Sequence, residues 1–152
     1  MRVTKRIGCF VALVASAGLP AFAADNCSGT YDNVTTSTST FEGAKGHSMT
    51  SFVYNQFTRS ENAPLFNVVG ECTGHMVTTP DGKVQMAGAC IQKAAEGASY
   101  STTWELAPGA ERGTWKRIAG TGKFAGKKAS GWFQTQFFEG KLVFGVWGGT
   151  CE

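Results

Sequence analysis

Apolar and polar residues alternate over short runs in most of the chain beyond residue 47. Successive side chains of a β-strand point to opposite faces, so this alternation predicts strands that bury one face. The runs are rich in β-branched and aromatic residues: HSMTSFVYNQF, PLFNVVGECTGHMV, KVQMAGACIQ, ASYSTTWEL, GTWKRI, SGWFQTQFF and KLVFGVWGG. With a first strand near CSGTYDNV, they predict about eight short strands.

Clusters of Gly, Pro, Asp and Asn separate most of these runs. Asp81-Gly82 and Glu139-Gly140 are typical of hairpin turns, because such residues accept the positive φ that tight turns need. The segment TTSTSTFEGAKG is polar and low in complexity, which predicts a loop or a frayed strand end. The best helix candidate, IQKAAEGAS, would form a short helix at most.

The first 23 residues predict a secretory signal peptide. A basic start, MRVTKR, precedes the apolar run IGCFVALVASAGL, and small residues surround a cleavage site after Ala23. The apolar run has about 13 residues, whereas a membrane-spanning helix needs roughly 20. We therefore expect an exported chain, periplasmic or secreted, whose mature part (residues 24–152) is one domain without a membrane span.

Removing this segment changes the charge balance. It takes away three of the 14 lysines and arginines, and the remaining 11 balance 11 aspartates and glutamates. Non-specific binding to nucleic acid relies on a net basic surface or a strong basic patch. We therefore expect no nucleic-acid partner, and we interpret the lysines between residues 116 and 128 as a solvated loop.

The mature chain keeps four of the five cysteines, Cys27, Cys72, Cys90 and Cys151. An even number of cysteines in an exported chain predicts disulfides, with three possible pairings. Cys72 and Cys90 lie almost equally far from the predicted turn at Asp81-Gly82, which favours a cross-strand bridge and leaves Cys27 for Cys151. A zinc site is the alternative, but these spacings are far longer than the short steps typical of structural zinc.

About eight antiparallel strands without partner helices fit either a sandwich or a closed barrel. A bridge between Cys27 and Cys151 favours closure, because it makes the first and last strands neighbours. The 20 glycines suit strongly coiled strands and bulges. We therefore predict an all-β, eight-stranded antiparallel closed barrel.

The segment GTWKRIAGTGKFAGKKASGWF, residues 113–133, contains neither a Walker loop nor a dinucleotide fingerprint, because each of those needs a helix after the glycines. It resembles the G-x-W-x-(I/L)-x-G-G-T-G-K-(F/Y)-x-G-x-x-G-x-G segment of allene oxide cyclase barrel-like proteins, a superfamily that includes plant dirigent proteins. Its departures from that pattern include Ala119 and residues 127–129. The segment would connect two barrel strands, with Gly120, Gly122 and Gly126 able to take positive φ and Phe124 plugging one end of the barrel.

This resemblance implies an eight-stranded barrel whose apolar lumen binds a small molecule. In cyclases of the superfamily the lumen controls ring closure of a lipid-like substrate, and dirigent proteins steer the coupling of phenolic radicals. Our first hypothesis is a non-enzymatic binder of a small apolar or aromatic molecule. The alternatives are a cyclase- or isomerase-like enzyme and an interaction protein with a filled barrel. The residues indicate no cofactor and no oligomeric state.

Candidate site residues follow from the polar and aromatic positions of the predicted strands. Glu71 and His75 share one strand face and form a weak catalytic pair, and Glu105 is a third weak candidate. Strand alternation leaves open whether these three face the lumen or solvent. Weak ligand-binding candidates are Tyr54, Trp104, Trp132, Gln134, Gln136 and Trp147. No short metal-binding spacing is present, so we expect no metal site.

Overall fold

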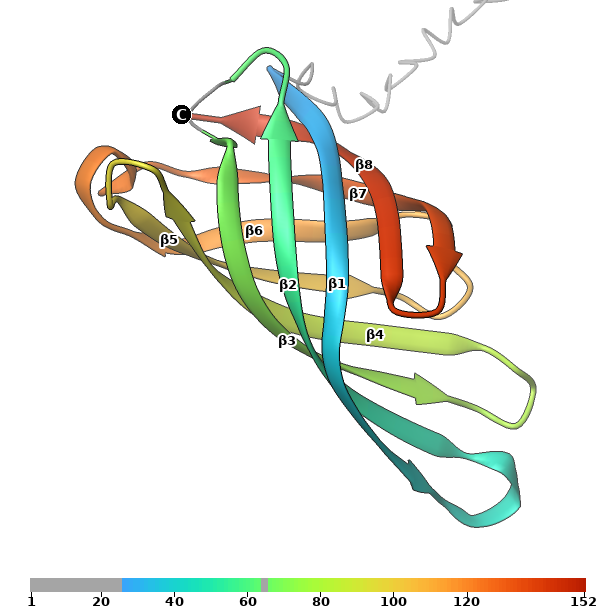
Figure 1. Ribbon diagram of the computed structural model, residues 1–152. Helices are drawn as coiled ribbons and strands as arrows, with labels where there is room; N and C mark the ends of the chain where they lie inside the picture. The colour runs from blue at the N-terminus through green and yellow to red at the C-terminus, as the bar shows by residue number, and fades with distance from the viewer. Residues whose placement is uncertain (1–25, 64–65) are drawn as a thin grey trace, which may run out of the picture.

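A computed structural model describes residues 26–63 and 66–152. They form one closed antiparallel barrel in which each strand pairs with its neighbours in the sequence and β8 pairs with β1 (Figure 1). The strands are β1 (Cys27–Glu42), β2 (Ser48–Ser60), β3 (Val68–Thr78), β4 (Val84–Ala94), β5 (Ser99–Leu106), β6 (Gly113–Gly120), β7 (Ala129–Glu139) and β8 (Leu142–Cys151). This confirms the predicted eight-stranded closed barrel and excludes the sandwich.

Within residues 26–63 and 66–152, helical structure is confined to short turns of 3-10 helix, among them η1 (Ala44–Gly46) and η3 (Gly122–Phe124). The helix candidate IQKAAEGAS is wrong: its first part completes β4 and the rest is a turn around Gly97, whose φ is +82°. No helix of the described residues is long and apolar enough to cross a membrane. The predicted signal peptide, residues 1–23, lies outside the described residues.

The barrel closes where the two ends of the described chain meet. β1 pairs with β8 from Cys27 opposite Gly149 to Val34 opposite Leu142. The disulfide Cys27–Cys151 joins the same two strands with their Cα atoms 5.9 Å apart. The second disulfide, Cys72–Cys90, joins directly opposite residues of β3 and β4. Both predicted pairings are therefore confirmed.

The first strand is longer than its composition indicates. The segment TTSTSTFEGAKG forms the far half of β1 and the tip of a hairpin, with pairing to β2 that extends to Glu42 opposite Ser48. A register shift between Thr35 and Ser37 follows the last pair with β8, so this half of β1 pairs with β2 alone and projects beyond the barrel (Figure 1). Of the two expectations for this segment the loop is wrong and the strand end is closer, because threonine, although polar, is well suited to strands.

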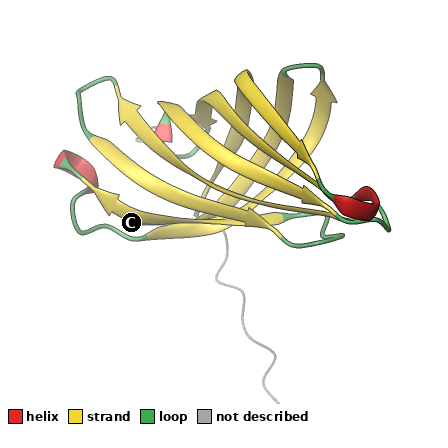
Figure 2. Cartoon of the chain, turned by 90° about the horizontal axis from the view of Figure 1, so that it is seen from below, coloured by secondary structure: helices red, strands yellow, loops and turns green. Residues whose placement is uncertain are grey.

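The two ends of the barrel differ. One end, which we call the floor, gathers the start of β1, the end of β8 and the largest buried cluster. The other end, which we call the mouth, carries the hairpin turns β1–β2, β3–β4 and β7–β8 and the half-buried side chains of Met86 and Leu106. In Figure 2 the strands curve round one axis, with loops and short helical turns at the two ends.

The glycine-rich segment between β6 and β7 closes the floor. Phe124, in η3, is only 1% exposed and belongs to the buried floor cluster, in agreement with its predicted role as a plug. Gly122 and Gly126 have φ of +54° and +70°, which is the left-handed region that favours glycine. Gly120 is different: its φ is not positive, but a Cβ there would lie 2.5 Å from the Phe124 carbonyl oxygen, so close approach explains this glycine.

Candidate ligand-binding lumen

The barrel encloses a cavity of about 170 Å³. Every strand except β3 contributes side chains to its lining. Nine of the lining residues are aromatic: Tyr31, Phe52, Tyr54, Phe66, Tyr100, Trp104, Trp115, Phe133 and Trp147. The remainder include amides, hydroxyls and aliphatic groups, which is the composition of a small-molecule site with an apolar body and a few polar anchors.

Glycines on the inner face make room for these large rings. A Cβ at Gly74 of β3 would lie 2.7 Å from both the Phe52 ring and the Trp104 ring. A Cβ at Gly113 would lie 2.1 Å from the Phe133 ring, and one at Gly145 would lie 2.4 Å from the Tyr31 ring. The rings therefore lie against the barrel wall in the places of missing side chains, and the centre of the lumen stays open.

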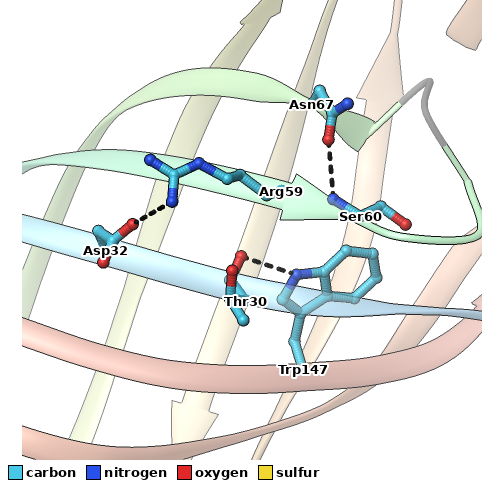
Figure 3. Close-up of polar contacts among 6 residues, drawn as sticks. All are labelled: Thr30, Asp32, Arg59, Ser60, Asn67 and Trp147. Atoms are coloured by element: carbon cyan, nitrogen blue, oxygen red, sulfur yellow. Dashed lines mark hydrogen bonds and ion pairs between the residues drawn. The ribbon is translucent and has the colours of Figure 1, made fainter.

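The rings also contact one another. Phe52 stacks on Trp104 with centroids 6.2 Å apart, and the Phe133 ring meets Trp104 edge-on at 6.1 Å. Trp147 meets Trp115 at 5.9 Å. The indole N–H of Trp147 donates to the Thr30 carbonyl over 3.2 Å (Figure 3), so this polar group is satisfied by the barrel itself. These contacts hold the rings in place before any ligand enters.

The floor of the lumen is an aromatic triangle around a cation. The rings of Phe66, Tyr100 and Phe124 have centroids 4.7–6.2 Å apart. The Arg117 guanidinium carbon lies 4.8–5.1 Å from all three centroids. Burial lowers the pKa of Arg117, and the faces of the rings compensate part of the lost hydration. The floor is thus closed by side chains, and Arg117 is not part of the cavity lining.

A chain of hydrogen bonds crosses one wall of the lumen. The Thr102 hydroxyl donates to Gln92 Oε1 over 3.2 Å, and Gln92 Nε2 donates to Gln56 Oε1 over 2.7 Å. Gln92 and Gln56 lie on β4 and β2, on either side of Gly70 in β3. A Cβ at Gly70 would lie 2.8 Å from Gln92 Cγ, so the absence of a side chain there lets Gln92 reach across β3.

All three tyrosines of the chain, Tyr31, Tyr54 and Tyr100, line the lumen. Burial raises the pKa of each phenol above its ordinary value near 10. For Tyr31 a hydrogen bond of 2.9 Å to the Thr135 hydroxyl opposes this effect, and for Tyr100 the charge of Arg117 does. The lumen therefore disfavours charge on its phenols.

We expect an alkaline titration to detect this effect. Because the folded pKa values exceed the unfolded ones, the tyrosines contribute their full stability below about pH 10 and lose it as the pH rises further. The slope is about 1.4 kcal/mol per pH unit for each tyrosine that has ionised only in the unfolded chain. Just above pH 10 the folded protein should show less tyrosinate absorbance than the urea-unfolded chain, in which all three tyrosines titrate near their ordinary pKa. Full tyrosinate absorbance in the folded protein would contradict the burial of these phenols.

The structure divides the six ligand-binding candidates into two groups. Tyr54, Trp104 and Trp147 line the cavity. The other candidates, all on β7, do not: Trp132, Gln134 and Gln136.

The reason lies in the register of β7. Phe133 is directly opposite Trp147 of β8, and opposite residues share a face, so Phe133 and Thr135 point inward and their neighbours point outward. On the outer side, the Arg112 guanidinium lies 4.3 Å from the Trp132 ring and its Nε donates to Gln134 Oε1 over 3.3 Å. A register shift then sets Gln136 apart as the extra residue of a bulge.

Glu71, His75 and Glu105 do not face the lumen. Cys72 and Trp104 point inward, so their neighbours Glu71 and Glu105 lie on the outer face, as does His75. All three are exposed, and Glu105 accepts a hydrogen bond of 3.4 Å from the Thr114 hydroxyl. Of the two faces left open by the sequence, the structure places all three on the outer one, and a catalytic role for them stays a prediction.

Sequence reasoning missed several lining residues. Tyr31 and Phe133 were not singled out, because the face of a strand cannot be assigned without its register. For lining residues nearer to Cys90 the Cys72–Cys90 disulfide is an available signal, because Cys90 lines the lumen and its Sγ lies 3.7 Å from the Tyr54 hydroxyl. Counting outward from an inward-facing cysteine pair places Gln92 and Thr102 inside as well. Within residues 26–63 and 66–152, no group of three or more His, Cys, Asp or Glu side chains could hold a metal ion.

Comparison with known proteins supports the architecture. No protein-family model matches the chain, and no curated protein matches its sequence. Among solved structures, the fold is similar to that of the pterocarpan synthase dirigent protein, with a TM-score of 0.50 and 10% sequence identity. The match covers 93% of this chain and 96% of the other. At such identity the likeness concerns the fold alone, and it shows that the chain has a dirigent-like β-barrel.

Proposed function

We propose that this protein binds one small aromatic or apolar molecule in the lumen of its barrel. The observation that carries the proposal is a cavity of about 170 Å³ with nine aromatic lining residues, above a floor that side chains close. An apolar protein cavity of about 150 Å³ holds benzene. The volume therefore suits one aromatic ring with a small substituent.

The chemistry of the lining favours binding over proton transfer. Its polar side chains are hydroxyls, phenols and amides. General acid–base catalysis needs a group whose pKa lies near the working pH, and burial moves the pKa of the lumen phenols away from neutrality. These groups suit hydrogen bonding to a bound molecule, so binding is preferred to the cyclase- or isomerase-like alternative.

We also propose that the protein is exported and that it belongs to the allene oxide cyclase barrel-like superfamily. Two disulfides are compatible with an oxidising compartment such as the periplasm or the extracellular space. The predicted signal peptide supports export, and the dirigent-like fold supports the superfamily. In this proposal Phe133 and Thr135 contact the ligand in place of the outward-facing Trp132 and Gln134.

The four tryptophans provide an internal test. Trp104, Trp115 and Trp147 line the cavity, whereas Trp132 is outside it. On titration with toluene or acetophenone, the indole N–H signals of the three lumen tryptophans should shift in ¹H–¹⁵N NMR spectra, and the Trp132 signal should not. Burial of about 150–200 Å² of aromatic surface corresponds to about 4 kcal/mol, or a Kd of about 1 mM.

A matched pair of variants locates the binding site. Thr58 lines the cavity, whereas Thr73 is exposed on the outer face of β3. Thr58→Phe should abolish binding by filling the lumen, and Thr73→Phe should leave binding unchanged. If neither probe shifts the lumen signals of the unmodified protein, the lumen does not bind such molecules, and an interaction protein with a filled barrel becomes the better description.

A further inference from the structure

Two amide side chains stand side by side on the inner face of β1 and β2. Asn33 and Gln56 are directly opposite each other in the register of these strands, and both line the cavity. Opposite residues on one face have Cβ atoms about 4.5–5.5 Å apart. Their amino groups are therefore close enough to approach a single atom in the lumen.

In each amide the oxygen is either hydrogen-bonded or enclosed. Gln56 Oε1 accepts the hydrogen bond from Gln92 Nε2. Asn33 Oδ1 is fully enclosed and has no hydrogen-bond partner among the described residues. The amino nitrogens are neither enclosed in this way nor hydrogen-bonded to described residues. The lumen thus presents two N–H donor groups from neighbouring strands.

Gln56 is held in this orientation by the buried chain that begins at Thr102. Gln92 and Thr102 are 5% and 6% exposed, so the Thr102–Gln92–Gln56 chain is shielded from water. A fixed donor loses little conformational entropy when it binds a ligand. The arrangement suits an acceptor with two lone pairs, such as a carbonyl oxygen.

The lining also selects against a charged acceptor. Within the described residues it contains no lysine, arginine or histidine side chain. Transfer of a carboxylate into such surroundings is costly unless a cation or several donors compensate it. An uncharged carbonyl group meets the two donors without that cost.

We infer that the ligand is an uncharged aromatic carbonyl compound whose oxygen accepts hydrogen bonds from Asn33 Nδ2 and Gln56 Nε2. This assignment rests on the proposed binding function and adds the chemical class of the ligand. The ring of the ligand packs among the lumen aromatics, and the carbonyl oxygen faces the junction of β1 and β2.

A pair of isosteric probes tests the inference. Acetophenone and α-methylstyrene have the same shape, but only acetophenone has a carbonyl oxygen. A net gain of about 0.5–1.5 kcal/mol for each hydrogen bond makes acetophenone about tenfold tighter in NMR titrations. The side-chain NH₂ signals of Asn33 and Gln56 should shift with acetophenone and not with α-methylstyrene. Benzoate should bind more weakly than acetophenone.

Substitution of Asn33 then assigns the effect. Asn33→Leu removes an unpartnered enclosed oxygen and one donor, so the fold should tolerate it. The preference for acetophenone should fall from about tenfold to about threefold, while the affinity for α-methylstyrene stays the same or rises. Asn55→Leu is the matched control, since Asn55 is the exposed neighbour of Gln56 on β2, and it should keep the full preference.

The outcomes separate this inference from the proposed function. If both probes bind equally, or benzoate binds best, the lumen binds molecules but the assigned class is wrong. If the preference survives Asn33→Leu, another group recognises the oxygen and the assignment to this amide pair is overturned. If neither probe binds, the proposed function fails and the inference fails with it. If Asn33→Leu does not fold, the side-chain NH₂ signals of Asn33 and Gln56 in the unmodified protein test the assignment. Equal shifts with both probes, or no shift with acetophenone, would overturn it.

Discussion

Replacing Phe124 by alanine is expected to lower the free energy of unfolding by about 3–5 kcal/mol. Phe124 is 1% exposed and contacts Phe66, Tyr100 and the Arg117 guanidinium. The substitution removes the transfer energy of a buried ring and leaves a cavity at the floor. It also takes away one of the three ring faces that compensate the buried charge of Arg117.

Urea denaturation followed by circular dichroism measures this effect. Phe41→Ala is the matched control, because Phe41 is 69% exposed on the projecting part of β1 and should change stability by less than about 0.5 kcal/mol. A loss below about 1 kcal/mol for Phe124→Ala would mean that the floor is not the packed centre of the fold.

Removal of the Cys27–Cys151 disulfide is expected to be at least as damaging. Its cysteines are 124 residues apart, and the chain-entropy estimate for closing such a loop is about 5 kcal/mol. The Cys72–Cys90 bridge spans only 18 residues, for which the same relation gives about 3 kcal/mol. The double variant Cys27→Ser/Cys151→Ser should therefore unfold at a lower denaturant concentration than Cys72→Ser/Cys90→Ser.

The two double variants serve as controls for each other, because each removes one bridge and adds two serines. The order of their unfolding midpoints is the deciding result. The reverse order would show that the shorter bridge is supported more by its packing under Tyr54, Phe52 and Trp104 than by loop entropy.

Much of the fold was predictable because it depends on local signals. Hairpin turns at Gly82 and Gly140, alternating apolar residues and evenly spaced strands are all visible over short windows. The disulfide pairing was predictable because Cys72 and Cys90 lie at nearly equal distances on either side of the turn at Asp81-Gly82. Phe124 could be assigned to one end of the barrel because the glycines around it indicate a tight connection. Gly120 contributes to this connection by its small size and not by a positive φ.

The lining of the lumen was only partly predictable, because it depends on register and bulges. A single residue decides the face of a strand, and on β7 the aromatic pair Trp132-Phe133 offers both choices. Because Phe133 is opposite the inward-facing Trp147 of β8, Phe133 faces the lumen and Trp132 does not. The bulge at Gln136 then changes the alternation again, and nothing in the run SGWFQTQFF marks its position.

The amide pair shows the same dependence on pairing. Asn33 and Gln56 are 23 positions apart in the chain, and their meeting depends on the register between β1 and β2. Gln92 reaches Gln56 only because Gly70 lies between them. Such contacts across a strand have no signature in the sequence of any one segment.

The position of the Cys27–Cys151 disulfide also determines the orientation of the barrel when the protein is attached to a surface or to a fusion partner. Both residues belong to the floor, so a surface or fusion partner linked through Glu152 lies on the side away from the mouth. Immobilisation through Glu152 would leave the mouth directed to solution. A sensor chip or display scaffold prepared in this way would present every copy in the same orientation.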